Sequence, residues 1–265
     1  MQALPNPNQL LIGALAFLRI GAILFALPMI GDSPTPIRVR VLLALAITIG
    51  IYGVIPPQWP PNLNADVLVV SSYVLREVLV GLTIGFCARI AFDGMMMAAA
   101  VVAYQMGFGT ANLYLPDYNE KMDGFSAMHR MLIMLIFLSL DLHQIFFTAI
   151  ADTFLLIPGG AANFTGTSAN IIVKLTGGIL TIAIELAAPI LVALLFTMAA
   201  LGLVARAVPN MNAFTMSFPL SFTVGLVIYV ATLPLFPNWM GTHFDEVKGQ
   251  IHSAILGLTT THTHP

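Results

Sequence analysis

Seven charged residues lie inside long apolar stretches of this sequence, where an ionisable side chain is rare. They are Arg19, Arg76, Glu77, Arg89, Asp93, Asp141 and Glu185. A charge that faces lipid at the centre of a bilayer costs at least ~2.5 kcal/mol, so such residues normally face protein or a water-filled path. Two kinds of chemistry are compatible with this pattern. The charges either form ion pairs that hold helices together, or they relay a proton or an ion.

Spacing restricts the role of four of these charges. Arg89 and Asp93 are four residues apart, so on a helix they share one face and can pair. We interpret them as a neutralised structural pair, and a proton or ion relay is the alternative. Arg76 and Glu77 are adjacent and point in different directions. Each of them therefore needs its own partner from another helix.

Small and flexible side chains near these charges indicate close packing. Gly81 and Gly85 form a small-xxx-small step, which lets another helix approach closely. We expect this step to pack against other subunits. The sequence also has 14 methionines, three of them in the run Met95–Met97. These side chains fit ordinary apolar packing, and their flexibility also suits a deformable seal around varied partners.

Glu185 lies four residues before Pro189. Proline lacks an N–H group and its ring clashes with the carbonyl four residues back, so this spacing predicts a break or kink in a helix. A carboxylate beside exposed backbone groups is also found in the discontinuous helices of transporters. A kink buried in protein is our interpretation, and a transporter site is the alternative.

The histidines do not form a convincing ligand set. His129 and His143 are fourteen residues apart, a spacing typical of two haem ligands on one helix, but a second helix with two more histidines is absent. We interpret His129 and His143 as histidines satisfied by polar neighbours. His262 and His264 belong to a Thr-rich end, and we expect no metal there. Protease, P-loop and dinucleotide motifs are also missing, so we predict no cofactor and no enzyme activity.

Composition places the chain among membrane proteins. Charged residues make up 8% of the sequence and apolar residues 58%, and the mean hydropathy is +0.91. Soluble domains contain about 25% charged residues. The net charge of −2 makes nucleic acid an improbable partner. The single cysteine, Cys87, excludes a disulfide within the chain.

Six apolar blocks predict an all-α, polytopic membrane protein with long, kinked helices and helical hairpins. The blocks are Leu10–Ile30, Val39–Ile55, Val67–Phe108, Met128–Ala151, Ile171–Ala205 and Ala213–Phe236. The third would reach about 60 Å as one helix, twice the ~30 Å core of a bilayer. We expect one domain over residues 1–236 and a partly disordered tail over 237–265. Arg38 and Arg40 mark the first connection as cytoplasmic.

Three stretches of the sequence, in order and with consistent spacing over residues 10–236, carry a family resemblance. The first contains Arg19, Pro28, Gly31, Arg38 and Arg40, and the second contains Arg76, Glu77, Gly81, Gly85, Phe86, Arg89, Phe92 and Gln105–Gly109. The third reads GLVARAVPNMNAF over Gly202–Phe214, followed by Ser217–Leu220 and Gly225. The chain resembles the FliR family, flagellar type III export-gate proteins that are related to SctT of injectisomes.

This resemblance implies a structural gate subunit in the bacterial inner membrane, at the flagellar basal body. FliR-like proteins assemble with FliP and FliQ in a helical gate that passes unfolded flagellar subunits, and FlhA and FlhB complete the apparatus. The injectisome gate is the alternative within the same architecture. A proton-coupled secondary transporter, which would use Asp93, Glu185 and the break at Pro189, is the alternative from another class.

The resemblance also implies roles for particular residues. A loop that plugs the closed channel would fall near Met106–Asp117 and begin with Gln105, Met106, Gly107, Phe108 and Gly109. Helix breaks would fall at Pro189, Arg206, Pro209 and Pro219. The embedded charges Arg76, Glu77, Arg89, Asp93 and Glu185 would act as ties within a helix or between subunits. We therefore expect the isolated chain, with Arg76, Glu77 and Glu185 unpaired, to be unstable without its partners.

Overall fold

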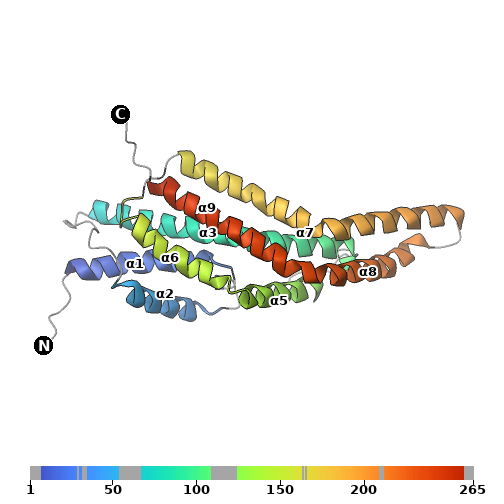
Figure 1. Cartoon of the computed structure of the whole chain (residues 1–265), viewed down its shortest axis with the longest axis horizontal. Coiled ribbons are helices and arrows are strands. Elements are labelled where there is room, and N and C mark those ends of the chain that lie inside the picture. The colour runs from blue at the N-terminus through green and yellow to red at the C-terminus, as the bar shows by residue number, and fades with distance from the viewer. Residues whose placement is uncertain are drawn as a thin grey trace. The chain divides into compact units, whose positions relative to one another are not determined.

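The computed structural model describes residues 7–28, 30–31, 35–53, 67–108, 124–162, 164, 166–208 and 212–259. These residues form α-helices and one short 3-10 turn, which confirms the all-α fold (Figure 1). The elements in chain order are α1 (Pro7–Ala26), α2 (Ile37–Ile51), α3 (Val67–Gln105), α5 (Gly124–Ser139), α6 (His143–Leu156), α7 (Gly166–Ala207), α8 (Ala213–Thr232), η2 (Leu233–Leu235) and α9 (Phe236–Thr259).

Several helices are long and apolar enough to cross a membrane. Within the described residues there are four, at Asn8–Ala26, Val67–Gln105, Thr176–Ala207 and Thr215–Leu258. The broken pair α5 and α6 can supply a fifth span. A crossing needs about 20 residues, so the 39-residue α3 is long enough to reach well beyond a bilayer. The sequence-based prediction of a polytopic membrane protein is therefore confirmed.

The chain folds into two compact units, each built from separated parts of the sequence. The first unit contains Met1–Ile90, Leu142–Thr176 and Phe244–Pro265, and the second contains Ala91–Asp141 and Gly177–His243. We expected a single domain over residues 1–236, and the structure divides the chain differently. The reason lies in the long helices, because α3, α7 and α9 each pass from one unit into the other.

Each unit has its own apolar core. In the first unit, α1 contributes Leu15, Ile20 and Leu24, which are 1% exposed or less. Phe154 of α6 and Phe244 of α9 are also buried in this unit. The core of the second unit contains the following side chains from α3 and the turn after it, α5, α7, α8 and α9: Met95, Val102, Met106, Ile133, Ile190, Tyr229 and Met240.

We expected a partly disordered tail over residues 237–265, and the described part of that tail is helical. Residues Phe236–Thr259 form α9, whose apolar side chains recur every three or four residues. Those that are buried in the first unit are Phe244, Val247, Ile251, Ala254, Ile255 and Leu258. This spacing places one stripe of a helix in the core and leaves the polar face outside. Residues 260–265 lie outside the described part.

The fourth apolar block, Met128–Ala151, is not one helix. Helix α5 ends at Ser139 and α6 begins at His143, and Asp141 between them has a φ of 54°. A positive φ is uncommon for a residue with a side chain and is incompatible with a right-handed helix. The helix therefore has to stop at this residue, although neither proline nor glycine marks the position.

Candidate functional site

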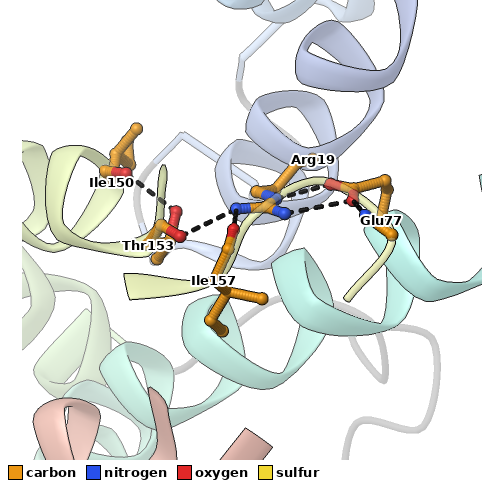
Figure 2. Close-up of polar contacts among 6 residues, drawn as sticks. Arg19, Glu77, Ile150, Thr153 and Ile157 are labelled. Atoms are coloured by element: carbon orange, nitrogen blue, oxygen red, sulfur yellow. Dashed lines mark hydrogen bonds and ion pairs between the residues drawn. The ribbon is translucent and has the colours of Figure 1, made fainter. Parts of the chain in front are cut away.

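A buried ion pair joins two helices of the first unit. Arg19 of α1 donates from Nε to one Glu77 oxygen at 2.5 Å and from Nη2 to the other at 3.0 Å (Figure 2). Arg19 is 0% exposed and Glu77 of α3 is 1% exposed. This fork-to-fork geometry gives a guanidinium and a carboxylate their strongest hydrogen bonds. Glu77 thus has a partner within the chain, and the expectation that it is unpaired in the isolated chain is wrong.

The third donor of Arg19 caps the end of α6. Nη1 lies 2.9 Å from the carbonyl oxygen of Thr153 and 3.0 Å from that of Ile157 (Figure 2). Carbonyls at the end of a helix carry partial negative charge, so a cation is favourable there. The Thr153 carbonyl also accepts from the Ile157 N–H at 3.0 Å. The guanidinium also lies 4.6 Å from the centre of the Phe154 ring. Arg19 of α1 therefore connects its own helix to both α3 and α6.

The loop after α6 is held by the neighbouring pair Arg76 and Glu77. Glu77 accepts a hydrogen bond from the Gly160 N–H at 2.7 Å, and Arg76 Nη1 donates to the Gly160 carbonyl at 3.0 Å. Gly160 has a φ of +72°, and a side chain there would collide with the Tyr73 ring. Both charges of α3 thus bind the backbone of one residue, Gly160. Sequence reasoning identified the charges but not Thr153, Ile157 or Gly160 as their partners.

Two glycines of α3 allow α1 to approach closely. A Cβ atom at Gly81 would lie 2.5 Å from the Arg19 carbonyl oxygen, and one at Gly85 would lie 2.5 Å from the Ala26 Cβ. The step was expected to pack against other subunits. That expectation is wrong, because α1 of the same chain occupies this face. Close approach itself is confirmed, and it brings the backbone of Arg19 next to the helix that carries Glu77.

In the second unit, the residues assigned to the start of a plug form a tight turn after α3. Helix α3 ends at Gln105, Met106 is completely buried, and Gly107 has a φ of +101°. Glycine adopts this conformation without a steric penalty. Phe108 is half-buried at the end of the described segment. Gly109 and the rest of the expected loop to residue 117 lie outside the described residues.

Helix α8 supplies a glycine and two rings that pack on this turn. A Cβ atom at Gly225 would lie 2.7 Å from Met106 Cγ, and one at Gly107 would lie 2.6 Å from the Phe218 ring. The Phe108 ring is 5.8 Å from the Phe222 ring between centroids, edge to face. Aromatic pairs prefer this arrangement. The turn is therefore seated on α8 by shape, with small residues opposite large ones.

His129 is satisfied inside the second unit, as its interpretation from the sequence predicted. Its Nδ1 lies 2.8 Å from the Tyr229 hydroxyl and its Nε2 lies 3.2 Å from the Met95 carbonyl oxygen. The ring is 2% exposed and lies against Phe125 and Phe236. Both ring nitrogens are engaged, so neither is oriented as a haem ligand.

Glu185 also has a partner within the chain. His243 Nε2 lies 3.2 Å from a Glu185 oxygen, and the His243 ring stacks on Trp239 with 3.8 Å between centroids. The expectation that Glu185 is unpaired is therefore wrong. Arg89 and Asp93 are half-buried on α3. Their pairing, and contacts of any of these charges with other subunits, stay predictions.

The expected helix breaks are Pro189, Arg206, Pro209 and Pro219, and the kink expected at Pro189 stays a prediction. Pro189 lies inside α7 and Pro219 lies inside α8, so neither residue ends its helix. A proline removes one intrahelical donor, and neighbouring helices or local adjustments can compensate for that loss in an apolar setting. Arg206 lies in the last turn of α7 and is exposed. Pro209 lies outside the described residues.

Comparison with known proteins decides the family. Residues 10–247 match the family model of bacterial export proteins, family 1. The chain belongs to this family. Curated relatives in the family include the flagellar biosynthetic protein FliR of Escherichia coli strain K12, which is 30% identical over 91% of each chain. FliR of Aquifex aeolicus is 27% identical over 93% of this chain and 94% of its own.

The family match confirms the resemblance seen in the sequence. FliR of Bacillus subtilis strain 168 is 28% identical over 83% of this chain and 85% of its own, so the likeness spans most of the chain in distant bacteria. The matched region ends at residue 247, inside α9. The Arg19–Glu77 ion pair, called the clamp below, and the turn at Gly107 both lie within the matched region.

Proposed function

We propose that this chain is a structural pore or gate subunit of the flagellar type III protein export apparatus, without enzyme activity. In this proposal it lies in the bacterial inner membrane at the flagellar basal body and assembles with FliP and FliQ homologues, beside FlhA and FlhB homologues. Its cargo is unfolded flagellar protein. The match of residues 10–247 to an export family whose curated relatives are flagellar FliR proteins carries the proposal.

The turn after α3 supports a gating role for the segment that follows it. Met106 and Gly107 are seated on α8, and Phe108 packs on Phe222, so the start of the segment is held firmly. Contacts of this kind are apolar and fitted by shape. A seal for unfolded chains has to block ions without recognising a sequence, and apolar, deformable contacts satisfy that requirement.

Exposed apolar side chains support assembly and membrane contact. On α7, Leu195 is 68% exposed, Phe196 is 69% exposed and Leu203 is 72% exposed. Soluble monomers rarely expose contiguous apolar surface of this kind, and larger patches mark membrane or subunit contacts. The described polar clusters, by contrast, are engaged in structural contacts, as Arg19 and Glu77 show. This use of charge favours a structural subunit over a catalyst.

Deletion and complementation provide the test. A strain that lacks the gene should lose motility and filament secretion, and the tagged wild-type chain should restore both and co-purify with FliP and FliQ homologues. A matched control is an exposed substitution such as Ala46→Ser, which should complement fully. Normal motility in the deletion strain would overturn the proposal. Proton-coupled uptake by the isolated chain in liposomes would instead establish the transporter interpretation.

The plug assignment has its own test. Deletion of residues 107–109 should make the assembled gate leak ions, because the turn that packs on α8 before the expected plug is removed. Ion leakage is measured by the sensitivity of growing cells to sodium or by membrane-potential dyes. In the control variant, three glycines replace residues 107–109, so the length of the chain is kept. A tight, fully secreting deletion variant would show that the plug lies elsewhere, without affecting the wider proposal.

A further inference from the structure

Helices α1 and α2 of the first unit enclose an apolar groove that nothing in the described structure fills. Figure 1 shows the two helices side by side, in the two blues at the start of the colour bar. The groove has a volume of about 590 Å³ and is lined mainly by Leu10, Gly13, Ala14, Leu45, Ile49 and Tyr52. The small residues Gly13 and Ala14 leave the space open on the α1 side. Tyr52 closes one end, where its hydroxyl donates to the Gln9 carbonyl at 3.4 Å.

The side chains of α2 that line the groove belong to a longer row on one face of the helix, and Arg38 lies at the end of this row. Arg38, Leu42, Leu45, Ile49 and Tyr52 are spaced by four, three, four and three residues, so they lie on one helical face. Leu42 is 65% exposed and Ile49 is 69% exposed. The only buried residues of α2 are Ala44 and Thr48. The stripe is thus an apolar surface without a partner among the described residues.

Two arginines provide positive charge at one end of this surface. Arg38 is exposed, and in the described part of the chain no acidic side chain pairs with it. Arg40 is two positions after Arg38, so it projects from the other side of α2, with its guanidinium 5.5 Å from the centre of the Phe25 ring. That contact holds Arg40 near the end of α1, on the same end of the hairpin as Arg38.

We propose that this groove binds one acyl chain of an anionic phospholipid, whose phosphate lies at Arg38, while Arg40 adds positive charge at the same end of the hairpin. Arg38 and Tyr52 are fourteen positions apart, which corresponds to about 21 Å along a helix. One leaflet of the hydrocarbon core is about 15 Å deep, half of the ~30 Å core. Leu45 lies about 10 Å from Arg38 along the helix, so a chain that starts at Arg38 passes Leu42 and enters the near part of the groove, which begins at Leu45.

Charge selects the lipid over other occupants. The sequence predicts that the loop before Arg38 is cytoplasmic, and the cytoplasmic leaflet carries anionic lipid that attracts arginine. A helix of another protein would need an acid opposite Arg38 and side chains that fill the groove, and it remains an outcome of the test. The volume lies in the ~300–1,000 Å³ range of small-molecule sites. The site would fasten the α1–α2 hairpin to one leaflet.

The test uses the full-length chain in mild detergent, with bound lipid counted by native mass spectrometry. Phosphatidylglycerol and phosphatidylcholine with identical acyl chains are compared as probes. We expect phosphatidylglycerol to be retained preferentially, with Arg38→Gln lowering its retention about fivefold, the effect of one arginine at an anionic surface. Arg38→Lys should keep the preference, because the positive charge remains.

Filling the groove separates a chain-binding site from a charged surface. Ala14→Phe places a ring in the groove at an exposed position, so the fold should tolerate it while phosphatidylglycerol retention falls. Ala46→Phe is the matched control, since Ala46 is exposed on α2 but does not line the groove. Equal retention of the two lipids by the wild-type chain would overturn the proposal. Full retention of phosphatidylglycerol by the Ala14→Phe variant would also overturn it. So would cross-linking of the Ile49→Cys variant to another protein, because the groove would then hold a protein and not a lipid.

Discussion

Arg19 and Glu77, 58 residues apart in the chain, form two hydrogen bonds where water does not reach either side chain. The remaining Arg19 donor holds the Thr153 and Ile157 carbonyls, and Glu77 also accepts from the Gly160 N–H. A buried ion pair offsets its desolvation only when the other donors and acceptors are satisfied as well. This pair meets that condition, and it locks α1, α3 and α6 in one register.

Replacing Arg19 should therefore destabilise the first unit strongly. Arg19→Leu leaves the Glu77 carboxylate buried without its cation, and we expect the free energy of unfolding to fall by about 3–5 kcal/mol. Thermal unfolding of the purified chain in detergent measures this loss. Arg76→Leu is the milder comparison, because Arg76 is partly buried and donates to one carbonyl, and its effect should be about 1.5–3 kcal/mol.

The double variant Arg19→Leu with Glu77→Leu tests whether the pair acts as a unit. Removing both charges avoids the lone buried carboxylate, so the double variant should be more stable than Arg19→Leu alone. Recovery should be incomplete, since the Thr153 and Ile157 carbonyls lose their donor. If the two single losses simply added, the pair would not be coupled and the clamp would be refuted.

Gly160 should not accept a side chain. Gly160→Ala puts a Cβ against the Tyr73 ring at a φ of +72°, and we expect a loss of about 1–3 kcal/mol of stability. Gly177→Ala is the control, because Gly177 lies in α7 with open space around it and alanine favours a helix by about 0.5–1 kcal/mol. The same unfolding assay compares both. Equal melting temperatures for the two variants would contradict the strain argument.

Much of the fold could be predicted because membrane spans are written as long apolar runs. The blocks at Val67–Phe108 and Ile171–Ala205 correspond closely to α3 and α7. The partner of Glu77 could not be predicted, because it depends on which helices pack together and Arg19 is far away in sequence. The stop at Asp141 was equally hidden, since a positive φ at a non-glycine residue is imposed by tertiary packing.

For other differences between the prediction and the structure, the sequence does contain a pattern, but average hydropathy does not reveal it. Helix α9 is less apolar than the spans, yet Phe244, Val247 and Ile251 follow the three-and-four spacing of an amphipathic helix. Gly160 was visible as a glycine in a Pro-Gly-Gly loop, and a positive φ is the usual reason for glycine there. Helices α7 and α8 continue past Pro189 and Pro219, because proline in apolar surroundings does not have to end a helix.

Gly225 and Met106 should be coupled in the second unit. Gly225→Ala brings a methyl group to 2.7 Å from Met106 Cγ, so Met106 has to move and the turn at Gly107 moves with it. We expect a loss of about 1–3 kcal/mol, as for other overpacked cores, and reduced motility if the proposed gate function holds. Gly202→Ala in α7 has open space, so it should raise stability by about 0.5–1 kcal/mol and leave motility unchanged.

A second substitution distinguishes steric conflict from other effects of Gly225→Ala. Met106→Ala alone leaves a cavity at a completely buried position and should cost about 2–5 kcal/mol. In the double variant Met106→Ala with Gly225→Ala, the new methyl group enters that cavity. The stability loss of the double variant should therefore be smaller than the sum of the losses of the two single variants. Strict additivity in unfolding experiments would show that the two residues do not constrain each other.

Truncation separates the helix α9 from the residues after it. A chain that ends at His243 loses the buried stripe of α9 that begins at Phe244, so the first unit is left with exposed core. We expect its steady-state level in cells to fall several-fold, because partly unfolded chains are degraded. A chain that ends at Thr259 keeps every described contact and should accumulate normally. Both levels are measured by immunoblotting of membrane fractions, with motility as the second readout. If the chain that ends at His243 accumulated as well as the longer one, α9 would not stabilise the first unit, and the tail would behave as the hydropathy of the sequence suggested.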